Sequence, residues 1–528
     1  MNDDNNNIHS PWFLRFLMLT AVLCGGFVMV VEVMGSRIIG PFFGVGLFVW
    51  TSLIAVALLS LALGYWIAGY WADKREHPDN LYGIILVSGL LVMLIPFIKT
   101  AVIELCIPLG LRWGAFASTF LLFGPPLFVL GCVSPYLIKI ATKEFHLIGR
   151  TVGRFYALST LGSMVGTTAT GFFLISYFRV DTVFMLTAAV LIGMSVTYFV
   201  LFRKRYIMLL LMLLPVIFWP TYKPIDVVLS DGTRVQEVAN LSSYYGLTKV
   251  VDYTYEDKHV RDLLIDGFTQ GGFDMVNRVS LYEYSYLLEF IPYGLNPNGS
   301  QALVIGLGAG VVPMRYEARG VSVDAVDIDP VIVDVAKEFF DLKVSGEIYV
   351  DDARYFLTTN QKRYDYVIMD VFNGDLTPTL LLSYEAFGLI KKSLTDEGIF
   401  AINLVADIQN ETAGIHSILK TLRPLFEHVD YYPIHKKNKN NITNVVVVAY
   451  NGVARELNNG VFAGSRIYPP IRERVINSIL SPKKIAAPQR PPIVLTDDFN
   501  PLDTWDSGTR EGLRALVLAS DDLGLLRN

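Results

Sequence analysis

Long apolar runs fill the first 222 residues and restrict what this part of the chain can fold into. The chain has 528 residues with 44 Lys+Arg and 49 Asp+Glu, yet only 14 and 9 of these precede residue 223. A helix needs about 20 apolar residues to cross about 30 Å of hydrocarbon. Residues 1–222 are therefore predicted to form a transmembrane helical domain of six to eight spans in a lipid bilayer. The candidate spans are Trp12–Met34, Gly46–Trp71, Leu81–Ile98, Trp113–Ile140, Gly153–Tyr177, Thr182–Phe202 and a short Tyr206–Trp219.

A different pattern begins at Ala302–Gly310, which is predicted to be a buried strand followed by a glycine turn. The turn contains three glycines: Gly306, Gly308 and Gly310. Glycine lets the backbone turn tightly and approach a ligand closely. A second predicted strand, Val323–Asp329, ends in the carboxylates Asp327 and Asp329. A glycine turn after one strand and an acid after the next are typical of a nucleoside site, in which the acid binds the ribose hydroxyls.

The rest of the second part is predicted to be an α/β structure. Residues 223–295 contain β-rich runs, Lys249–Tyr255 and His259–Gly267, and are expected to form a small antiparallel sheet with a connecting helix. Residues 296–528 alternate strand and helix patterns, which predicts a Rossmann-like, doubly wound and mostly parallel sheet. Such a sheet binds its ligand at the carboxyl ends of its strands.

Four carboxylates follow predicted strands and are expected to surround one ligand: Asp327, Asp329, Asp352 and Asp370. Asp327 is the candidate ribose acceptor, and Asp352, followed by the small Ala353, would accept a hydrogen bond from the adenine amino group. Asp370 would lie across the pocket, where a carboxylate can take a proton from an amine or hold a cation. Each acid taken alone could instead be a helix cap or a solvated turn residue.

These residues resemble the spermidine synthase family of polyamine aminopropyltransferases over about residues 230–450. The matching positions are Asp266-Gly267 with Gln270, the Gly306–Gly310 turn, Asp327-Ile-Asp329, Asp352-Ala353 and Asp370. The resemblance implies a β-sheet followed by a Rossmann-like domain that binds decarboxylated S-adenosylmethionine through these residues. With its multi-span N-terminal part, the chain looks like the membrane-fused, spermidine-synthase-like proteins of bacteria. Leu495–Pro501 is also similar to those fused forms, although it could equally be a capped turn.

Three departures from the family pattern concern acids around the amine substrate. Ala309 stands where the family has Asp, Tyr284-Ser285-Tyr286 replaces Tyr-His-Glu or Tyr-Gln-Glu, and Asn373 replaces the second acid of Asp-Ser-x-Asp. Each lost charge-assisted bond to a di-cation is worth on the order of 1.5–3 kcal/mol. The change at position 309 is also expected to leave room for a ligand carboxylate. Both arguments favour ordinary S-adenosylmethionine over its decarboxylated form.

Three functions follow from this pattern. The first is cleavage of the sulfonium on its aminopropyl or amino-carboxypropyl side, releasing 5′-methylthioadenosine, with Tyr284 and Asp370 as catalytic residues. The acceptor would be an amine or part of the cofactor itself, which would make the enzyme a lyase. The second is methyl transfer, which releases S-adenosylhomocysteine. The third is a nucleoside-sensing domain on a transporter formed by residues 1–222.

The positive-inside rule gives conflicting expectations for the orientation in a bacterial inner membrane. Most basic loop residues are predicted to lie on the same side of the membrane as the N-terminus, which predicts a cytoplasmic N-terminus. Seven crossings would then place the catalytic domain outside, away from cytosolic adenosyl cofactors. A cytoplasmic catalytic domain requires that Tyr206–Trp219 does not cross, or that Lys99–Phe123 hides an extra crossing.

Charge and composition narrow the possible partners. With 30 basic and 40 acidic residues, residues 223–528 have a net charge of −10, which argues against nucleic-acid binding. No Cys/His pair has metal-ligand spacing, so no metal is expected. A small-molecule substrate is expected, and the family resemblance implies a homo-oligomer, either a dimer or a tetramer.

Overall fold

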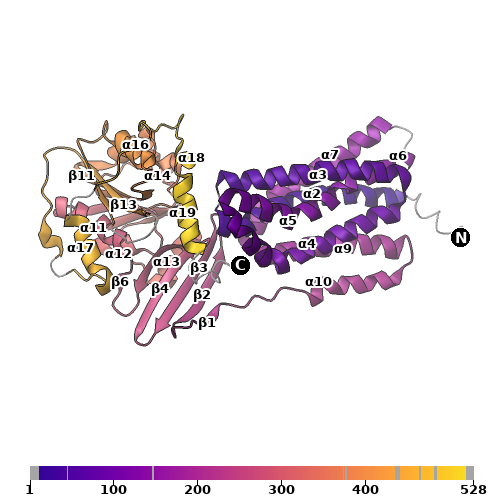
Figure 1. Ribbon diagram of the computed structural model, residues 1–528, viewed down its shortest axis with the longest axis horizontal. Helices are drawn as coiled ribbons and strands as arrows, with labels where there is room; N and C mark the ends of the chain where they lie inside the picture. Colours follow the sequence, from indigo (N-terminus) through magenta and orange to yellow (C-terminus); the bar gives the residue numbers. More distant parts are fainter. Residues whose placement is uncertain are drawn as a thin grey trace. The chain divides into compact units, whose positions relative to one another are not determined.

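The chain divides into two units between Lys223 and Pro224 (Figure 1). The computed structural model describes residues 11–44, 46–144, 148–372, 374, 377–434, 441–462, 465–480 and 484–518. The first unit is helical and the second is built on two β-sheets. This order of a helical part followed by an α/β part confirms the predicted fold class.

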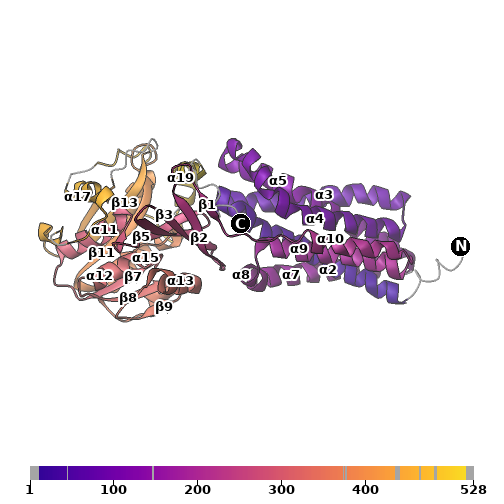
Figure 2. The ribbon, with the colours of Figure 1, turned by 90° about the horizontal axis from the view of Figure 1, so that it is seen from below.

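The first unit contains long apolar helices packed side by side (Figure 2). Within the described residues, five helices are long and apolar enough to cross a membrane, and one of them, Pro78–Thr142, bends at the 3₁₀ turn Ile107–Leu109. The stretch Lys99–Phe123 therefore holds a turn between two packed helices and no additional span. The helices are α2 (Pro11–Phe43), α3 (Leu47–Lys74), α4 (Pro78–Cys106), α5 (Gly110–Gly131), α6 (Val133–Glu144), α7 (Ile148–Ala169) with its continuation α8 (Ile175–Tyr177), and α9 (Val180–Leu201).

The last apolar segment of this unit returns along α9 (Figure 1). It consists of a 3₁₀ helix, Tyr206–Leu213, and α10 (Leu214–Ile217), and both pack against α9. Beyond α10, the Tyr222 ring lies 3.7 Å from the guanidinium of Arg179, the residue that precedes α9. At the other end of α9, the Phe202 ring lies 5.2 Å from that of Phe13 near the start of α2. The chain thus leaves the helical unit at the end opposite to the start of α2.

The second unit begins with a six-stranded antiparallel sheet in the order β1-β2-β3-β4-β5-β6. Its core is formed by alternate apolar residues of the central strands, such as Val250 and Leu263. A helix rich in aromatic residues, α11 (Glu283–Leu295), follows it. The strands are β1 (Asp226–Val228), β2 (Arg234–Ser242), β3 (Leu247–Tyr255), β4 (Lys258–Ile265), β5 (Phe268–Asp274) and β6 (Val279–Ser280).

A seven-stranded sheet follows in the order β12-β13-β11-β10-β7-β8-β9. Five neighbouring strands pair in parallel, β13 runs in the opposite direction beside β11, and β12 pairs antiparallel with β13 at the edge. The strands are β7 (Gln301–Ile305), β8 (Ser322–Asp327), β9 (Ile348–Val350), β10 (Tyr364–Met369), β11 (Leu394–Asp407), β12 (His428–Pro433) and β13 (Ile442–Tyr450). Long runs of Val and Ile occupy the central strands because helices cover both faces of this sheet.

Helices pack on both faces of the parallel sheet. One apolar core joins the sheet to α14 (Ala353–Thr359), α15 (Tyr384–Lys392) and α16 (Ala413–Leu422), and a second joins it to α11, α12 (Val311–Glu317) and α17 (Arg472–Leu480). Helix α13 (Pro330–Phe340) packs toward the antiparallel sheet. The last described elements of the chain are α18 (Leu502–Trp505) and α19 (Ser507–Leu518).

The strand order reverses between β7 and β10, and this is the position at which a ligand is expected. From β7 the chain proceeds to β8 and β9 on one side, and then crosses to β10 and β11 on the other. The backbone N–H of Asp370 donates to the carbonyl oxygen of Ile305 at 2.8 Å, so the loops after β7 and β10 begin side by side. In open α/β sheets, ligands bind at the carboxyl ends of the strands at such a point.

Candidate active site

A cavity of about 510 Å³ opens at the carboxyl ends of the parallel strands. Nine of the ten predicted site residues line it: Gln270, Tyr284, Gly306, Gly308, Asp327, Asp329, Asp352, Ala353 and Asp370. Gly310 is the exception, because a Cβ at this position would lie 2.8 Å from the Leu342 side chain, in the packing behind the turn. The strand-end pattern therefore brought together the residues of one cavity.

Gly306 and Gly308 form the turn that brings backbone to the cavity. Both have positive φ, +87° and +50°, which disfavours any residue with a Cβ. A Cβ at Gly306 would lie 2.2 Å from the carbonyl oxygen of Asp370, and one at Gly308 would lie 2.8 Å from that of Gln270. The turn is thus pressed against both β10 and β5, with no space for side chains.

Asp327 is held at the end of β8 by two backbone donors. Its Oδ2 accepts from the N–H of Leu307 at 2.8 Å, and its Oδ1 accepts from the N–H of Asp329 at 2.9 Å. Burial raises the pKa of Asp327 to about 6, against the effect of these hydrogen bonds. Each carboxylate oxygen has a second lone pair, so Asp327 can still accept from ligand hydroxyls.

Asp329 and Asp352 line the cavity and also cap helices. Asp329 accepts from the N–H of Val331 at 3.0 Å at the start of α13, and from the hydroxyl of Ser243 at 2.5 Å. Asp352 uses its Oδ1 for the N–H groups of Arg354 and Tyr355, at 2.9 and 3.0 Å, at the start of α14. Capping and ligand binding are compatible at Asp352, whose Oδ2 accepts no bond from the described residues.

Asp370 and Tyr284 meet at the other end of the cavity. Asp370 Oδ1 accepts from Nδ2 of Asn403 at 2.9 Å, and burial raises the pKa of Asp370 to about 6 although this hydrogen bond lowers it. Burial and then the charge of Asp370 raise the pKa of Tyr284 well above its usual value. Tyr284 is therefore a neutral phenol that can orient a ligand but cannot serve as a base, whereas Asp370 can accept a proton.

The sequence was compared with known protein families, and the match includes part of the residues that line the cavity. Residues 282–447 match the family model of the spermine/spermidine synthase domain. This part of the chain is therefore similar to a spermidine synthase domain. The predicted relation to the spermidine synthase family is confirmed.

Relatives of the synthase domain cover only part of the chain. An N-terminal histidine N-methyltransferase from Emericella nidulans is 35% identical over 133 residues, which are 24% of each chain. A polyamine aminopropyltransferase from Alkaliphilus oremlandii is 29% identical over 179 residues, 32% of this chain and 61% of the relative. The chain thus spans between a quarter and about three-fifths of these relatives. A probable spermidine synthase from Corynebacterium glutamicum matches in structure with a TM-score of 0.38 and 17% identity, covering 48% of this chain and 99% of that one.

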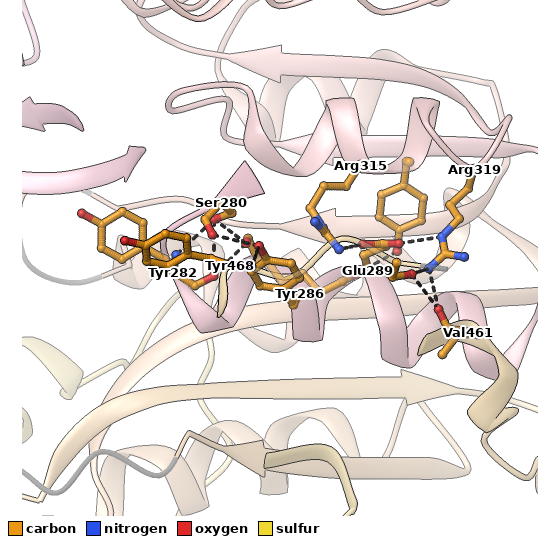
Figure 3. Close-up of polar contacts among 12 residues, drawn as sticks. Ser280, Tyr282, Tyr286, Glu289, Arg315, Arg319, Val461 and Tyr468 are labelled. Atoms are coloured by element: carbon orange, nitrogen blue, oxygen red, sulfur yellow. Dashed lines mark hydrogen bonds and ion pairs between the residues drawn. The ribbon is translucent and has the colours of Figure 1, made fainter. Parts of the chain in front are cut away.

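Helix α11, which carries Tyr284 into the synthase site, is anchored by a buried ion-pair cluster (Figure 3). Glu289 lies between Arg315 and Arg319 of the neighbouring helix region, and Arg319 Nε donates to it at 2.7 Å. The guanidinium of Arg315 also lies 4.0 Å from the ring of Tyr286. Tyr286 in turn donates to the carbonyl oxygen of Ser280 at 2.8 Å. This cluster fixes the position of α11 and hence of Tyr284.

Two of the positions that depart from the family pattern, Tyr286 and Ala309, do not line the cavity. This corrects the expectation that the changes at both positions alter the ligand pocket. Tyr286 is fully buried on the side of α11 away from Tyr284, because residues two apart on a helix point in nearly opposite directions. Ala309 is buried in an apolar cluster beside Gly271. Neither Ala309 nor Tyr286 lines the cavity, so the room expected from the replacement at 309 is not seen in the cavity wall. Asn373 lies outside the described residues.

Sequence reasoning missed several residues that line the synthase cavity. Tyr282 donates to Asp262 Oδ1 at 3.0 Å, and its ring stacks beside that of Tyr284 at 6.2 Å. Asn403 and Asn444 line the wall next to Asp370. The signal for Asn403 was a single amide within the otherwise apolar run that became β11.

The Leu495–Pro501 motif supports the cavity wall from outside. Asp497 Oδ1 accepts from Arg354 Nη1 at 2.7 Å, and Arg354 lines the cavity. Asn500 donates from Nδ2 to the carbonyl oxygen of Thr379 at 2.9 Å, next to the lining residue Leu380. The motif is thus a turn that ties the C-terminal segment to the side of the cavity lined by Arg354 and Leu380. Among the described residues, no group of three His, Cys, Asp or Glu side chains is placed to hold a metal ion.

Proposed function

We propose that the synthase unit binds S-adenosylmethionine, or its decarboxylated form, and cleaves the bond between sulfur and the aminopropyl or amino-carboxypropyl carbon. The product nucleoside is 5′-methylthioadenosine. One observation carries the proposal: acids for the adenosine part, Asp327 and Asp352, and a lone acid beside a phenol, Asp370 and Tyr284, line the same cavity. The aminopropyltransferase relatives support this choice of bond.

Two forms of this cleavage are chemically balanced. In transfer to an amine, the nitrogen lone pair attacks the carbon bonded to sulfur, and the electrons of the C–S bond pass to sulfur as a neutral thioether forms. Asp370 takes the proton that the new ammonium loses. In lyase-type cleavage, the carboxylate of S-adenosylmethionine itself attacks that carbon and closes a lactone, so no proton is moved.

The charges at the reacting end favour a ligand with a single positive nitrogen there. Asp370 is the only acid that lines this end of the cavity among the described residues, beside the neutral side chains Tyr282, Tyr284 and Asn403. A diamine would leave its second ammonium without a carboxylate. This arrangement supports a monoamine acceptor or reaction within the cofactor over transfer to putrescine.

The test is incubation of the purified full chain with S-adenosylmethionine or its decarboxylated form, with and without putrescine. Nucleoside products are identified by mass. We expect 5′-methylthioadenosine, and we expect Asp370→Asn to abolish its formation while binding persists. A variant that keeps the full rate would remove Asp370 from the mechanism, and ligand binding without turnover in the wild-type protein would indicate a sensor.

Methyl transfer is the second candidate, and the relative named as an N-methyltransferase favours it. Its product would be S-adenosylhomocysteine, because the methyl group leaves and the amino-carboxypropyl chain stays on sulfur. The same incubation separates the two reactions by the mass of the nucleoside.

We also propose a multi-pass location in a bacterial inner membrane, with the synthase unit in the cytoplasm. The helices suited to crossing a membrane and the cytosolic origin of adenosyl sulfonium compounds support this location. Because Tyr222 lies at the Arg179 end of α9, the start of α2 would then face the outside, against the basic residues gathered there. A dimer or tetramer is a further proposal that rests on the family, to be checked by light scattering.

A further inference from the structure

Two asparagine side chains on neighbouring strands form a hydrogen-bonded row that ends on the Asp370 carboxylate. Asn444 on β13 donates from Nδ2 to Oδ1 of Asn403 on β11 at 3.1 Å. Asn403 donates from Nδ2 to Oδ1 of Asp370 at 2.9 Å. All three residues line the cavity, and Asn403 is fully buried between apolar neighbours. Burial of an amide is costly unless its hydrogen bonds are made, so this row needs a reason beyond packing.

The row determines which end of the Asn403 amide faces the carboxylate. An asparagine amide donates at nitrogen and accepts at oxygen. Since Asn403 Oδ1 accepts from Asn444, its Nδ2 points to Asp370. The reversed amide would bring two acceptors together at Asp370 and two donors together at Asn444, and both contacts repel. Asn444 therefore acts on Asp370 through Asn403.

We propose that Asn403 and Asn444 are positioning residues that hold Oδ1 of Asp370 and leave its Oδ2 for one nitrogen of a primary amine or ammonium group. This inference rests on the proposed function, because that nitrogen belongs either to an acceptor amine or to the aminopropyl end of the adenosyl ligand. Among the described residues, Asp370 Oδ2 accepts no hydrogen bond, so it is available to the ligand.

The same row keeps the carboxylate ionised within a buried site. A donor to the charged form favours that form, and the Asn403 hydrogen bond lowers the pKa of Asp370 against the larger effect of burial. Loss of the amide must therefore raise this pKa further. The other titratable and charged groups on described elements around this end are Tyr282 before α11, Tyr284 on α11, Asp262 on β4, Asp327 at the end of β8 and Arg514 on α19.

The first test is Asn403→Leu, which keeps the side-chain size and removes the amide. In wild-type protein, the rate of 5′-methylthioadenosine formation should rise with pH through a midpoint near that of Asp370. In the variant, we expect this midpoint to move upward by about one pH unit, since one charge-assisted hydrogen bond is lost. A second readout needs no turnover. If the nitrogen belongs to the adenosyl ligand, the variant at pH 6.5 should bind S-adenosylmethionine about threefold more weakly than wild type, because a smaller fraction of Asp370 is ionised, yet bind neutral 5′-methylthioadenosine equally well.

A double-mutant comparison tests whether Asn444 acts on Asp370 only through Asn403. Asn444→Leu should move the midpoint in the same direction by a smaller amount, and it should add nothing in the Asn403→Leu background. The matched control is Asn296→Leu, which removes a buried amide bonded to the Glu397 carbonyl oxygen at 3.3 Å and should move neither midpoint. Asn444 is only half-buried, so Asn444→Leu can be used to test the inference if Asn403→Leu does not fold.

Butylamine identifies the source of the nitrogen. A midpoint shift that appears only when butylamine is added assigns the nitrogen to an acceptor, and a shift without it assigns the nitrogen to the ligand. An unchanged midpoint in Asn403→Leu, with turnover intact, would overturn this inference and leave the proposed function standing. If wild-type protein neither binds nor cleaves S-adenosylmethionine or its decarboxylated form, the proposed function itself fails.

Discussion

The carbonyl oxygen of Asp370 lies 2.2 Å from the position that a Cβ atom on residue 306 would occupy. Gly306 and Asp370 are therefore in close backbone contact just after β7 and β10, the two strands between which the sheet order reverses. The backbone of one loop is thus pressed against the residue that carries the proposed catalytic carboxylate. A change at Gly306 must displace Asp370.

Gly306→Ala should weaken ligand binding more than tenfold and destabilise the synthase unit, because it combines positive φ with a clash against Asp370. Gly320→Ala is the matched control: φ is +79°, but a Cβ there would meet no atom within 4 Å. The control should lose on the order of 1 kcal/mol from backbone strain alone. Calorimetric binding of S-adenosylmethionine and thermal unfolding measure both effects. Equal losses in the two variants would show that Asp370 is not displaced.

The rate of nucleoside release should depend on pH through Asp370. Burial raises the pKa of this carboxyl to about 6, and only its ionised form can accept a proton. We therefore expect the rate of transfer to an amine to fall below pH 6 and to be flat just above it, until other groups titrate. Single-turnover rates between pH 5 and 8 provide the measurement. A lyase-type reaction that moves no proton would instead lack this dependence or retain only a weak electrostatic one.

Asp506 should make the synthase unit less stable as pH rises from about 4 to about 7. Burial raises the pKa of Asp506 to about 7, so the folded state holds its proton more tightly than the unfolded chain does. The stabilisation is fully present below the unfolded pKa of about 3.9 and is lost as pH rises toward 7. Asp506→Asn cannot ionise, so the stability difference between variant and wild type should grow in favour of the variant from pH 5 to 7 and then level off. Parallel unfolding curves would contradict this assignment.

Glu289→Ala should destabilise the synthase unit by about 3–5 kcal/mol, because it leaves Arg315 and Arg319 without their shared buried carboxylate. Asp396→Ala is the control, since it removes an exposed ion pair with Arg363 at 3.7 Å and should change stability little. Urea unfolding gives both values. If the two variants behaved alike, the cluster would not be the anchor of α11.

Labelling with a membrane-impermeant maleimide should test the return of the chain along α9. The three native cysteines are buried, so the background should be low. In intact cells, we expect Glu76→Cys, at the end where α2 starts, to be labelled and Asp257→Cys, in the β3–β4 hairpin, to be protected. Protection at both positions would mean that the Tyr206–Ile217 segment does not cross the membrane.

Spacing along the chain was sufficient to predict the strand-end residues. Acids and glycines that directly follow strands are carried to one edge because parallel strands all end there, and the predicted strand-end acids with Gly306 and Gly308 line the cavity. Gln270 and Tyr284, which the family resemblance indicated, line it too. Gly310 does not line the cavity, because the turn continues into α12 and faces Leu342. Tyr286 failed as a cavity position because family alignment does not say which side of a helix faces the ligand.

The sequence by itself determined the helical and α/β parts, the parallel sheet and the acids at its edge, because hydrophobic period and turn residues are local properties. Only the tertiary structure decided that Asn444 meets Asn403 and that Asn403 meets Asp370. These contacts depend on how β13 returns antiparallel beside β11, with Asn403 opposite Val446 and Asn444 opposite Val405. Strand register across 41 residues is set by packing of the whole sheet, and no local pattern encodes it.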